Sequence, residues 1–177
     1  MKLTWFGGTT IRIHLGGLIL VADAAMAPTW IDQAELVSGA NRVFDLASKK
    51  VALPTIDLST WKAPRVRPLD AAAAEPTIVC GSPSVVLVHM DGERPLLLVA
   101  GELPQLGGRW IDEAVVVLLG NGAAISRRGG TLLDEHPPKL IAIAAPEPDV
   151  DFAVHALAGR LDGAGLMALE PGLGVEV

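Results

Sequence analysis

The feature that most limits the fold of this chain is a series of short, almost purely apolar runs, each followed or closed by glycine, proline or an acidic residue. They are LILVAD at 18–23, SVVLVHM at 84–90, PLLLVAG at 95–101, AVVVLLG at 114–120 and LIAIAA at 140–145. All are far shorter than the roughly 20 apolar residues of a membrane-spanning helix. Apolar runs of about four to eight residues between turn signals favour buried strands. The sequence therefore predicts a sheet-rich core.

Turn signals between these runs predict how several strands connect. KLTWF at 2–6 and TTIRIHL at 9–15 lie on either side of Gly7-Gly8, and Gly16-Gly17 separates the second segment from the first long apolar run. The alternation in TTIRIHL is typical of a half-buried strand. Asp91-Gly92 is a strong hairpin signal. We expect one domain over residues 1–177, which is long enough to bury a sizeable core.

Helical patterns are fewer. A short helix is expected between 28 and 37 with Thr29 as its N-cap, and one or two turns at 131–136 before a Pro-Pro pair. Residues 149–161 carry apolar side chains at helical spacing, with Asp149 placed to cap them. GNGAA, after the fourth apolar run, is expected to be a plain strand-to-helix turn and not a phosphate loop. It lacks both the full Gly-x-Gly-x-x-Gly fingerprint and the lysine of a P-loop. In residues 38–75, several prolines and the lack of a sustained pattern predict turns and brief strands.

Composition excludes several classes of partner. The net charge is −6, aromatic residues make up 4% and tyrosine is absent, so neither nucleic acid nor an anionic membrane is an expected partner. The single cysteine excludes an internal disulfide. The opening MKLTWFGG lacks the apolar region of a secretory signal, so we expect a soluble, cytoplasmic protein.

Both ends of the chain resemble small hydrolases of the metallo-β-lactamase fold. Their opening pattern is Trp-aromatic/Leu-Gly-His-Ser on the first strand, with an aspartate ending the third strand; Trp5, Phe6, Gly7 and Asp23 match it. PLLLVAGE resembles the strand that ends in a metal-bridging aspartate, with Glu102 at that position, and LEPGLGVEV resembles the closing strands. The resemblance covers about residues 1–24 and 94–177. It implies two packed, mainly antiparallel or mixed sheets in an αββα sandwich with outer helices, shortened in the middle.

The histidines of that family are missing at the matching positions. Gly8 and Thr9 stand where the pattern has His-Ser, and Ala144 to Pro146 occupy the end of the strand that ordinarily delivers the last histidine. No histidine lies between His14 and His89, where the resemblance implies His-x-His-x-Asp-His. A dinuclear zinc site needs several imidazoles and carboxylates around an open position. We therefore expect neither metal nor cofactor.

Three side chains remain as candidate functional residues. Asp23 and Glu102 are acids at strand ends; the structural alternative is that Asp23 ties down nearby backbone amides and that Glu102 caps a turn or pairs with Arg109. Trp61, in STWKAP, is the tryptophan expected to line an exposed surface.

His14 is expected to be solvent-facing or hydrogen-bonded, His89 to be exposed beside its hairpin turn and His155 to lie on the polar flank of its helix. His136 is expected to have a structural role at a helix end, and Arg127-Arg128 to be solvated loop charges.

Two functional hypotheses follow. The first is a non-catalytic metallo-β-lactamase-fold protein with a binding or scaffold role for an unknown small molecule or protein. The alternative is a hydrolase with a histidine-poor site, in which Asp23 and Glu102 hold one cation or act as acid and base. A shortened middle would leave a sheet edge open, which makes a homodimer reasonable.

Overall fold

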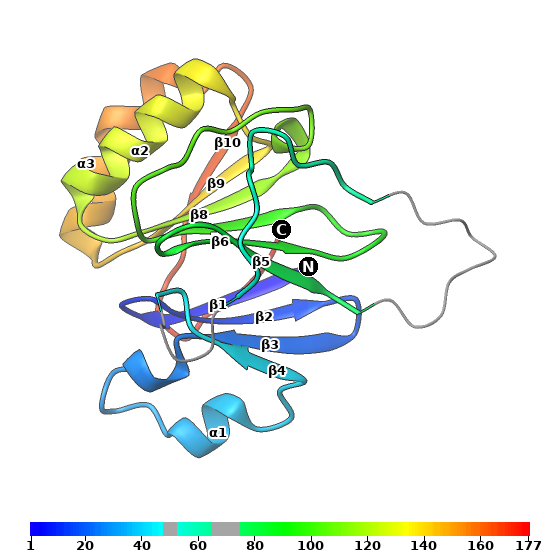
Figure 1. Cartoon of the computed structure of the whole chain (residues 1–177). Helices are drawn as coiled ribbons and strands as arrows, with labels where there is room; N and C mark the ends of the chain where they lie inside the picture. Colours follow the sequence, from blue (N-terminus) through cyan, green and yellow to red (C-terminus); the bar gives the residue numbers. More distant parts are fainter. Residues whose placement is uncertain (48–52, 65–74) are drawn as a thin grey trace.

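The computed structural model describes residues 1–47, 53–64 and 75–177 and has an α/β architecture with two mixed sheets and a few helices. In these residues the helices are α1 (Gln33–Val37), α2 (Gly122–Glu135) and α3 (Glu147–Leu157), with short 3-10 turns at Ala24–Met26, Ile111–Glu113 and Ala158–Arg160. Figure 1 shows one sheet below the other, α1 at the bottom and α2 with α3 at the top. The α/β class and the paired sheets expected from the sequence are therefore present.

The first sheet has five strands in the order β11-β1-β2-β3-β4 within the described chain. Their bounds are β1 Lys2–Gly7, β2 Thr10–Leu15, β3 Leu18–Ala22, β4 Arg42–Phe44 and β11 Gly174–Glu176. The first three are joined by the two Gly-Gly turns, as the sequence predicts, and run antiparallel. β4 pairs parallel with β3. All neighbours in this sheet except β3 and β4 are thus antiparallel.

The second sheet has six strands in the order β10-β9-β8-β7-β6-β5, counted over the described residues. Their bounds are β5 Thr77–Ser82, β6 Val85–His89, β7 Leu96–Val99, β8 Val115–Leu119, β9 Leu140–Ala144 and β10 Gly165–Ala168. β5, β6 and β7 form antiparallel pairs, which confirms the hairpin predicted at Asp91-Gly92. β7 to β10 are parallel. Of the five strand pairs in this sheet, two are therefore antiparallel and three are parallel.

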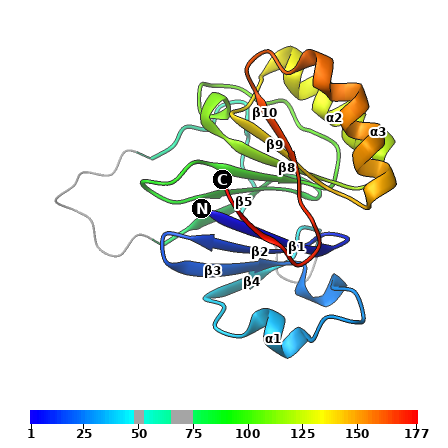
Figure 2. The same cartoon turned by 180° about the vertical axis from the view of Figure 1, so that it is seen from behind.

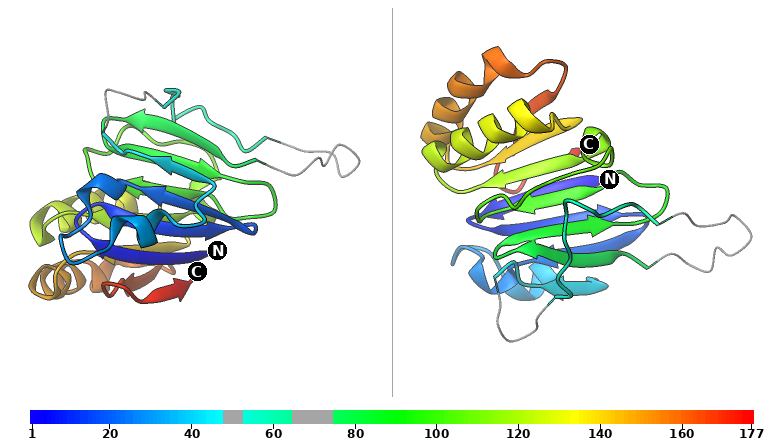
Figure 3. Two further views of the ribbon diagram at one scale, coloured as in Figure 1. Left: turned by 90° about the horizontal axis from the view of Figure 1, so that it is seen from below. Right: turned by 45° about the horizontal axis from the view of Figure 1, so that its top comes forward.

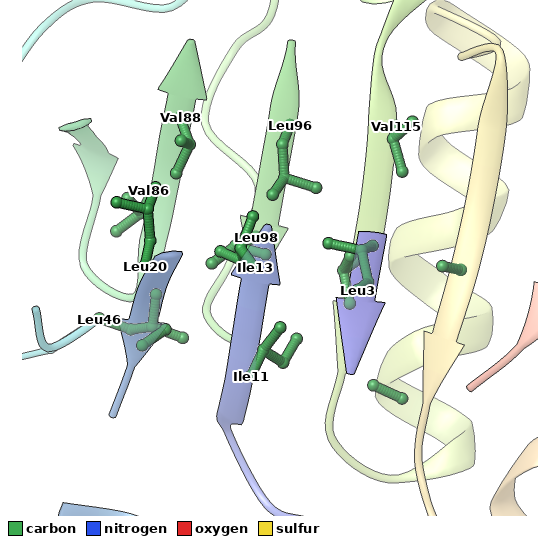
Figure 4. Close-up of a cluster of buried hydrophobic side chains, with 14 of the residues drawn as sticks. Leu3, Ile11, Ile13, Leu20, Leu46, Val86, Val88, Leu96, Leu98 and Val115 are labelled. Atoms are coloured by element: carbon green, nitrogen blue, oxygen red, sulfur yellow. The ribbon is translucent and has the colours of Figure 1, made fainter. Parts of the chain in front are cut away.

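The two sheets pack face to face through one apolar core. Figure 4 shows side chains of β1, β2 and β3 meeting those of β6, β7 and β8, among them Leu3, Ile13 and Leu98. In β6 the even-numbered Val86 and Val88 point into this core, whereas the odd-numbered side chains point to the other face of the sheet. The long apolar runs arise from this arrangement, because their strands are covered on both faces.

Each outer face is covered differently. On the first sheet, Leu36 of α1 packs against Val21 of β3 in a small satellite cluster. On the second sheet, α2 and α3 lie side by side over β8 and β9 (Figure 3), and their apolar side chains join a second core. The molecule therefore has a helix, two sheets and a pair of helices as successive layers.

The remaining half of the second sheet, β5 to β7, is covered by non-helical chain. Residues 53–64, here called the strap, pair with the edge of β5 through Ile56 N–H to Cys80 O (2.9 Å) and Cys80 N–H to Pro54 O (2.8 Å). Leu58 and Trp61 of the strap then pack on the outer face together with side chains of residues 103–111. The strap thereby closes the free edge of β5, which would otherwise be open to another strand.

α2 is longer than the sequence predicts, since the expected one or two turns form part of a 14-residue helix that contains Arg127 and Arg128. Gly129-Gly130 lies inside it, where glycine weakens an isolated helix. A Cβ on Gly129 would lie 2.7 Å from Leu157 Cδ1 of α3. The glycine therefore allows the two helices to approach closely, and tertiary packing outweighs the local propensity.

The helix caps also differ from the sequence expectation. Asp32, not Thr29, caps α1, and its carboxylate accepts hydrogen bonds from Ala34 N–H and Glu35 N–H. α3 begins at Glu147, so Asp149 lies within its first turn and does not cap it. The described part of 38–75 contains β4 and no helix, in line with the irregular segment predicted there.

The last two strands leave the chain's ends side by side. β10 pairs with β9 in the second sheet, whereas β11 crosses to the first sheet and pairs antiparallel with β1, as Figure 2 shows. Val177 N–H donates to Met1 O at 3.0 Å. Within the described ranges, no helix has the length and apolar character needed to cross a bilayer.

Candidate functional site

A groove runs along the edge where strands of both sheets end. β3 and β4 deliver Asp23 and Asp45 at their carboxyl ends, β7 delivers Ala100, and β8 delivers Gly120. The turn between β1 and β2 contributes Thr9. Ligands of α/β proteins commonly bind outside the carboxyl ends of parallel strands, so this edge is the candidate functional site.

The groove has two neighbouring compartments, which share Thr9 and Ala100. The first holds about 400 Å³ and is lined by Thr9, Asp23, Ala25, Met26, Asp45, Leu46, Ala47, Ser84 and Ala100. The second holds about 360 Å³ and is lined by Trp5, Gly8, Thr9, Ala100, Leu119, Gly120, Asn121, Ala144, Pro146 and Asp149. Both are large enough for a small molecule, and both combine apolar walls with a few polar groups.

Asp23 is a buried acid at the floor of the first compartment, with 7% of its surface exposed. Its carboxylate Oδ1 accepts a hydrogen bond from Leu46 N–H at 2.7 Å, and its own N–H donates to Phe44 O at 2.8 Å. Thr10 Oγ1 donates to its carbonyl at 2.9 Å. Its φ of 48° is left-handed, a conformation that aspartate tolerates better than most residues. Asp23 therefore ties the ends of β3 and β4 together, and the amide that its carboxylate holds, that of Leu46, follows β4 and does not belong to the Gly7-Gly8 turn.

Asp45 is the acid that the sequence reasoning missed. It follows β4 directly and is exposed in the same compartment as Asp23. β4 is only three residues long and lies in an irregular segment, so no periodic pattern marks it. The signal available in the sequence was an acidic residue directly after the apolar pair Val43-Phe44. Asn121 follows β8 after the intervening Gly120 and lines the second compartment.

The beginning of α2 faces the second compartment, but two of its first amide groups are occupied. Gly122 N–H donates to Asp149 Oδ1 at 2.7 Å, and Ala124 N–H donates to Asn121 Oδ1 at 2.9 Å. A phosphate placed there would meet the Asp149 carboxylate, which repels an anion and already takes one donor. This geometry agrees with the plain strand-to-helix turn expected from GNGAA.

Glu102 does not lie in the groove with Asp23. Its carboxylate forms an ion pair with Arg127 of α2 (Oε1 to Nη2, 2.5 Å), and its side chain is 74% exposed. The expected pairing with Arg109 is not formed; Arg127 takes that role because it lies on a helix and not in the loop predicted for it. Glu102 lines neither compartment. The lining residue closest to it in sequence, among those described, is Ala100.

Trp61 lies on the strap and outside both compartments. Its ring is half-buried between His89 and Trp110, with edge-to-face geometry and centroid separations of 5.3 and 5.1 Å. His89 was expected to be exposed and is buried instead, because the strap covers it. His14 and His155 are exposed, as predicted.

The side chains at the groove do not fit a dinuclear zinc centre. Its potential donors are the carboxylates, the Asn121 amide and two hydroxyls, with no imidazole among the described lining residues. Within residues 1–47, 53–64 and 75–177, no three His, Cys, Asp or Glu side chains come together as a metal site. No family model, curated protein or solved structure matches the chain.

Proposed function

We propose that this chain is a non-catalytic protein of the metallo-β-lactamase fold, with the αββα sandwich of that family, and that its groove binds a small molecule without hydrolysing it. One observation carries the proposal. Gly8, Thr9, Asp23, Ala144 and Pro146, at positions where the resemblance implies a metal site or its surroundings, all line one groove. Four of the five have no side chain that coordinates zinc well.

The lining indicates the chemistry of the ligand. The walls of the first compartment are mainly alanine, methionine and leucine side chains, which favour an apolar body. Asp23 and Asp45 add carboxylates at this compartment. A compact ligand with an aromatic or aliphatic body and an amine suits this combination, because the amine offers both positive charge and N–H donors.

Binding is tested with benzylamine and its neutral analogue benzyl alcohol, by titration of ¹⁵N-labelled protein. We expect benzylamine to shift the amide signals of Thr9, Leu46 and Ala100 and to bind more tightly than benzyl alcohol. Asp45→Asn should weaken benzylamine up to about fivefold, since an exposed charge pair contributes up to about 1 kcal/mol. Asp112→Asn, which removes an exposed acid outside the groove, is the matched control.

The proposal that the protein is not a catalyst is tested separately. We expect protein purified without chelator to contain zinc, iron and manganese at below about a tenth of an equivalent. A stoichiometric metal together with hydrolysis that a chelator abolishes would contradict the proposal. So would amide shifts that spread over the whole protein or fall only outside the groove.

A further inference from the structure

His89 ends β6 directly beneath the strap. It follows Leu87 on the outer face of the second sheet, and 7% of its surface is exposed. Neither ring nitrogen has a hydrogen-bond partner in the described part of the chain. The imidazole packs against the ring of Trp61, which in turn packs against Trp110. The neutral imidazole therefore lies in the layer that holds the strap to the sheet.

Two glycines show how closely the strap is docked. A Cβ on Gly81 of β5 would lie 2.2 Å from Leu58 Cδ1, so the missing side chain provides the notch that Leu58 fills. A Cβ on Gly107 would lie 2.3 Å from Ser59 O. The strap thus contacts β5 and the loop after β7 without a gap. The packing beneath Trp61 leaves no room for the rearrangement that a new charge there would require.

The charges around His89 favour its neutral form. Burial lowers the pKa of His89 from its ordinary 6.5, and the carboxylate of Asp91, whose Oδ1 lies 3.7 Å from Nε2, opposes that shift only in part. β5 places the uncharged Thr77 opposite His89. On the strap, hydrogen bonds from Ser59 lower the pKa of Asp57 below 3.8, outside the range in which an imidazole titrates.

We propose that His89 makes the docking of the strap sensitive to pH: protonation of the imidazole releases residues 53–64 from β5 and β6 under mildly acidic conditions. An imidazolium beneath Trp61 places a positive charge and two N–H donors in an apolar layer, which is costly. The Asp91 carboxylate, 3.7 Å from Nε2, offsets this cost only in part, and neither ring nitrogen has a hydrogen-bond acceptor among the described residues. Release lets water reach both ring nitrogens. It also uncovers the apolar side chains of β5 and β6 that the strap covers.

The direction and size follow from proton linkage. Above pH 6.5 the imidazole is neutral in both states and docking has its full strength. Below that value the released state binds a proton that the docked state resists, so docking weakens as the pH falls toward the lowered pKa. The ratio of released to docked strap rises by at most tenfold per pH unit, which sets an upper limit of about thirtyfold at pH 5.

The test is hydrogen exchange at the two amides that join strap and sheet, Ile56 and Cys80, between pH 7.5 and 5. Rates are divided by the intrinsic rates at each pH, so only protection is compared. We expect protection of both amides to fall progressively from pH 7.5 to pH 5, by no more than about thirtyfold. The amides of Val117 and Ile143, in the central strands β8 and β9, should keep theirs. A dye that binds apolar surface should gain fluorescence over the same range.

His89→Phe is the matched variant, because its ring can pack against Trp61 but cannot titrate. Protection in this variant should not change with pH, and His89→Leu gives the same test if phenylalanine is too large. Unchanged protection in the wild-type protein overturns the proposal. An equal loss in the His89 variants also overturns it, as does a parallel loss at Val117 and Ile143, which would indicate global acid unfolding.

Discussion

Replacing Gly107 by alanine probes the contact between the strap and the loop that follows β7. The new Cβ would lie 2.3 Å from Ser59 O, 3.1 Å from Ser59 C and 3.2 Å from Ser59 Cα. These are backbone atoms, so no side-chain rotation relieves the contact. The strap must retreat by about 0.7 Å before the closest approach reaches the 3.0 Å below which real Cβ atoms are essentially never found. Leu58 would then no longer sit fully in its notch at Gly81.

The cost is that of overpacking a well-packed region, typically about 1–3 kcal/mol. In a protein of this size each kcal/mol lowers the melting temperature by about 2–4 °C, so Gly107→Ala should melt about 2–12 °C below the wild type. Gly159→Ala is the control, because a Cβ there meets nothing within 4 Å and its φ is not left-handed. That variant should stay within about 0.5 kcal/mol of the wild type.

Thermal unfolding followed by far-UV circular dichroism measures the stability, and hydrogen exchange locates the effect. Exchange should accelerate at Ile56 and Cys80 near neutral pH, where His89 is uncharged. If Gly107→Ala is as stable as Gly159→Ala and both amides keep their protection, the strap does not lie where the structure places it.

Two further substitutions test the core and the start of α2. Leu98→Ala, in the core between the sheets, should destabilise by about 2–5 kcal/mol in urea unfolding, whereas Leu173→Ala at an exposed site should stay within about 0.5 kcal/mol. Asp149→Ala leaves Gly122 N–H without its acceptor and should cost about 0.5–2 kcal/mol in the same assay. Asp149→Asn keeps a carbonyl oxygen as an acceptor and should cost less; equal losses in the two Asp149 variants would count against a capping role.

The strands were predictable because their signals are local. LILVA, VVVLL and LIAIA are apolar on both faces and end at turn residues, so each run defines its own limits. The pairing of β6 with β7 is equally local, since Asp91-Gly92 lies between them. Asp23 directly follows β3, at the strand end where the sequence places it, whereas Glu102 lies three residues beyond the end of β7.

The errors concern residues whose surroundings come from distant parts of the chain. His89 is buried by the strap, which precedes it by about 25 residues, and no pattern in the sequence near His89 predicts this contact. The Glu102 carboxylate pairs with Arg127, which lies on α2. The Gly-Gly pair inside this helix concealed its length in the sequence. Asp45 was missed because β4 has three residues and no periodicity.

The pairing of β11 with β1 has a consequence for the order of folding. Lys2 lies opposite Glu176, so this contact closes a loop that contains almost every other residue of the chain. The entropy of closing a loop grows with its length, and contacts of such long range form slowly. β5, β6 and β7 need only short loops to pair. The six-stranded sheet can therefore begin as a local hairpin nucleus. The edge of β1, by contrast, stays unpaired until the two ends of the chain meet. During that time a strand of a second, partly folded chain can compete with β11 for this edge.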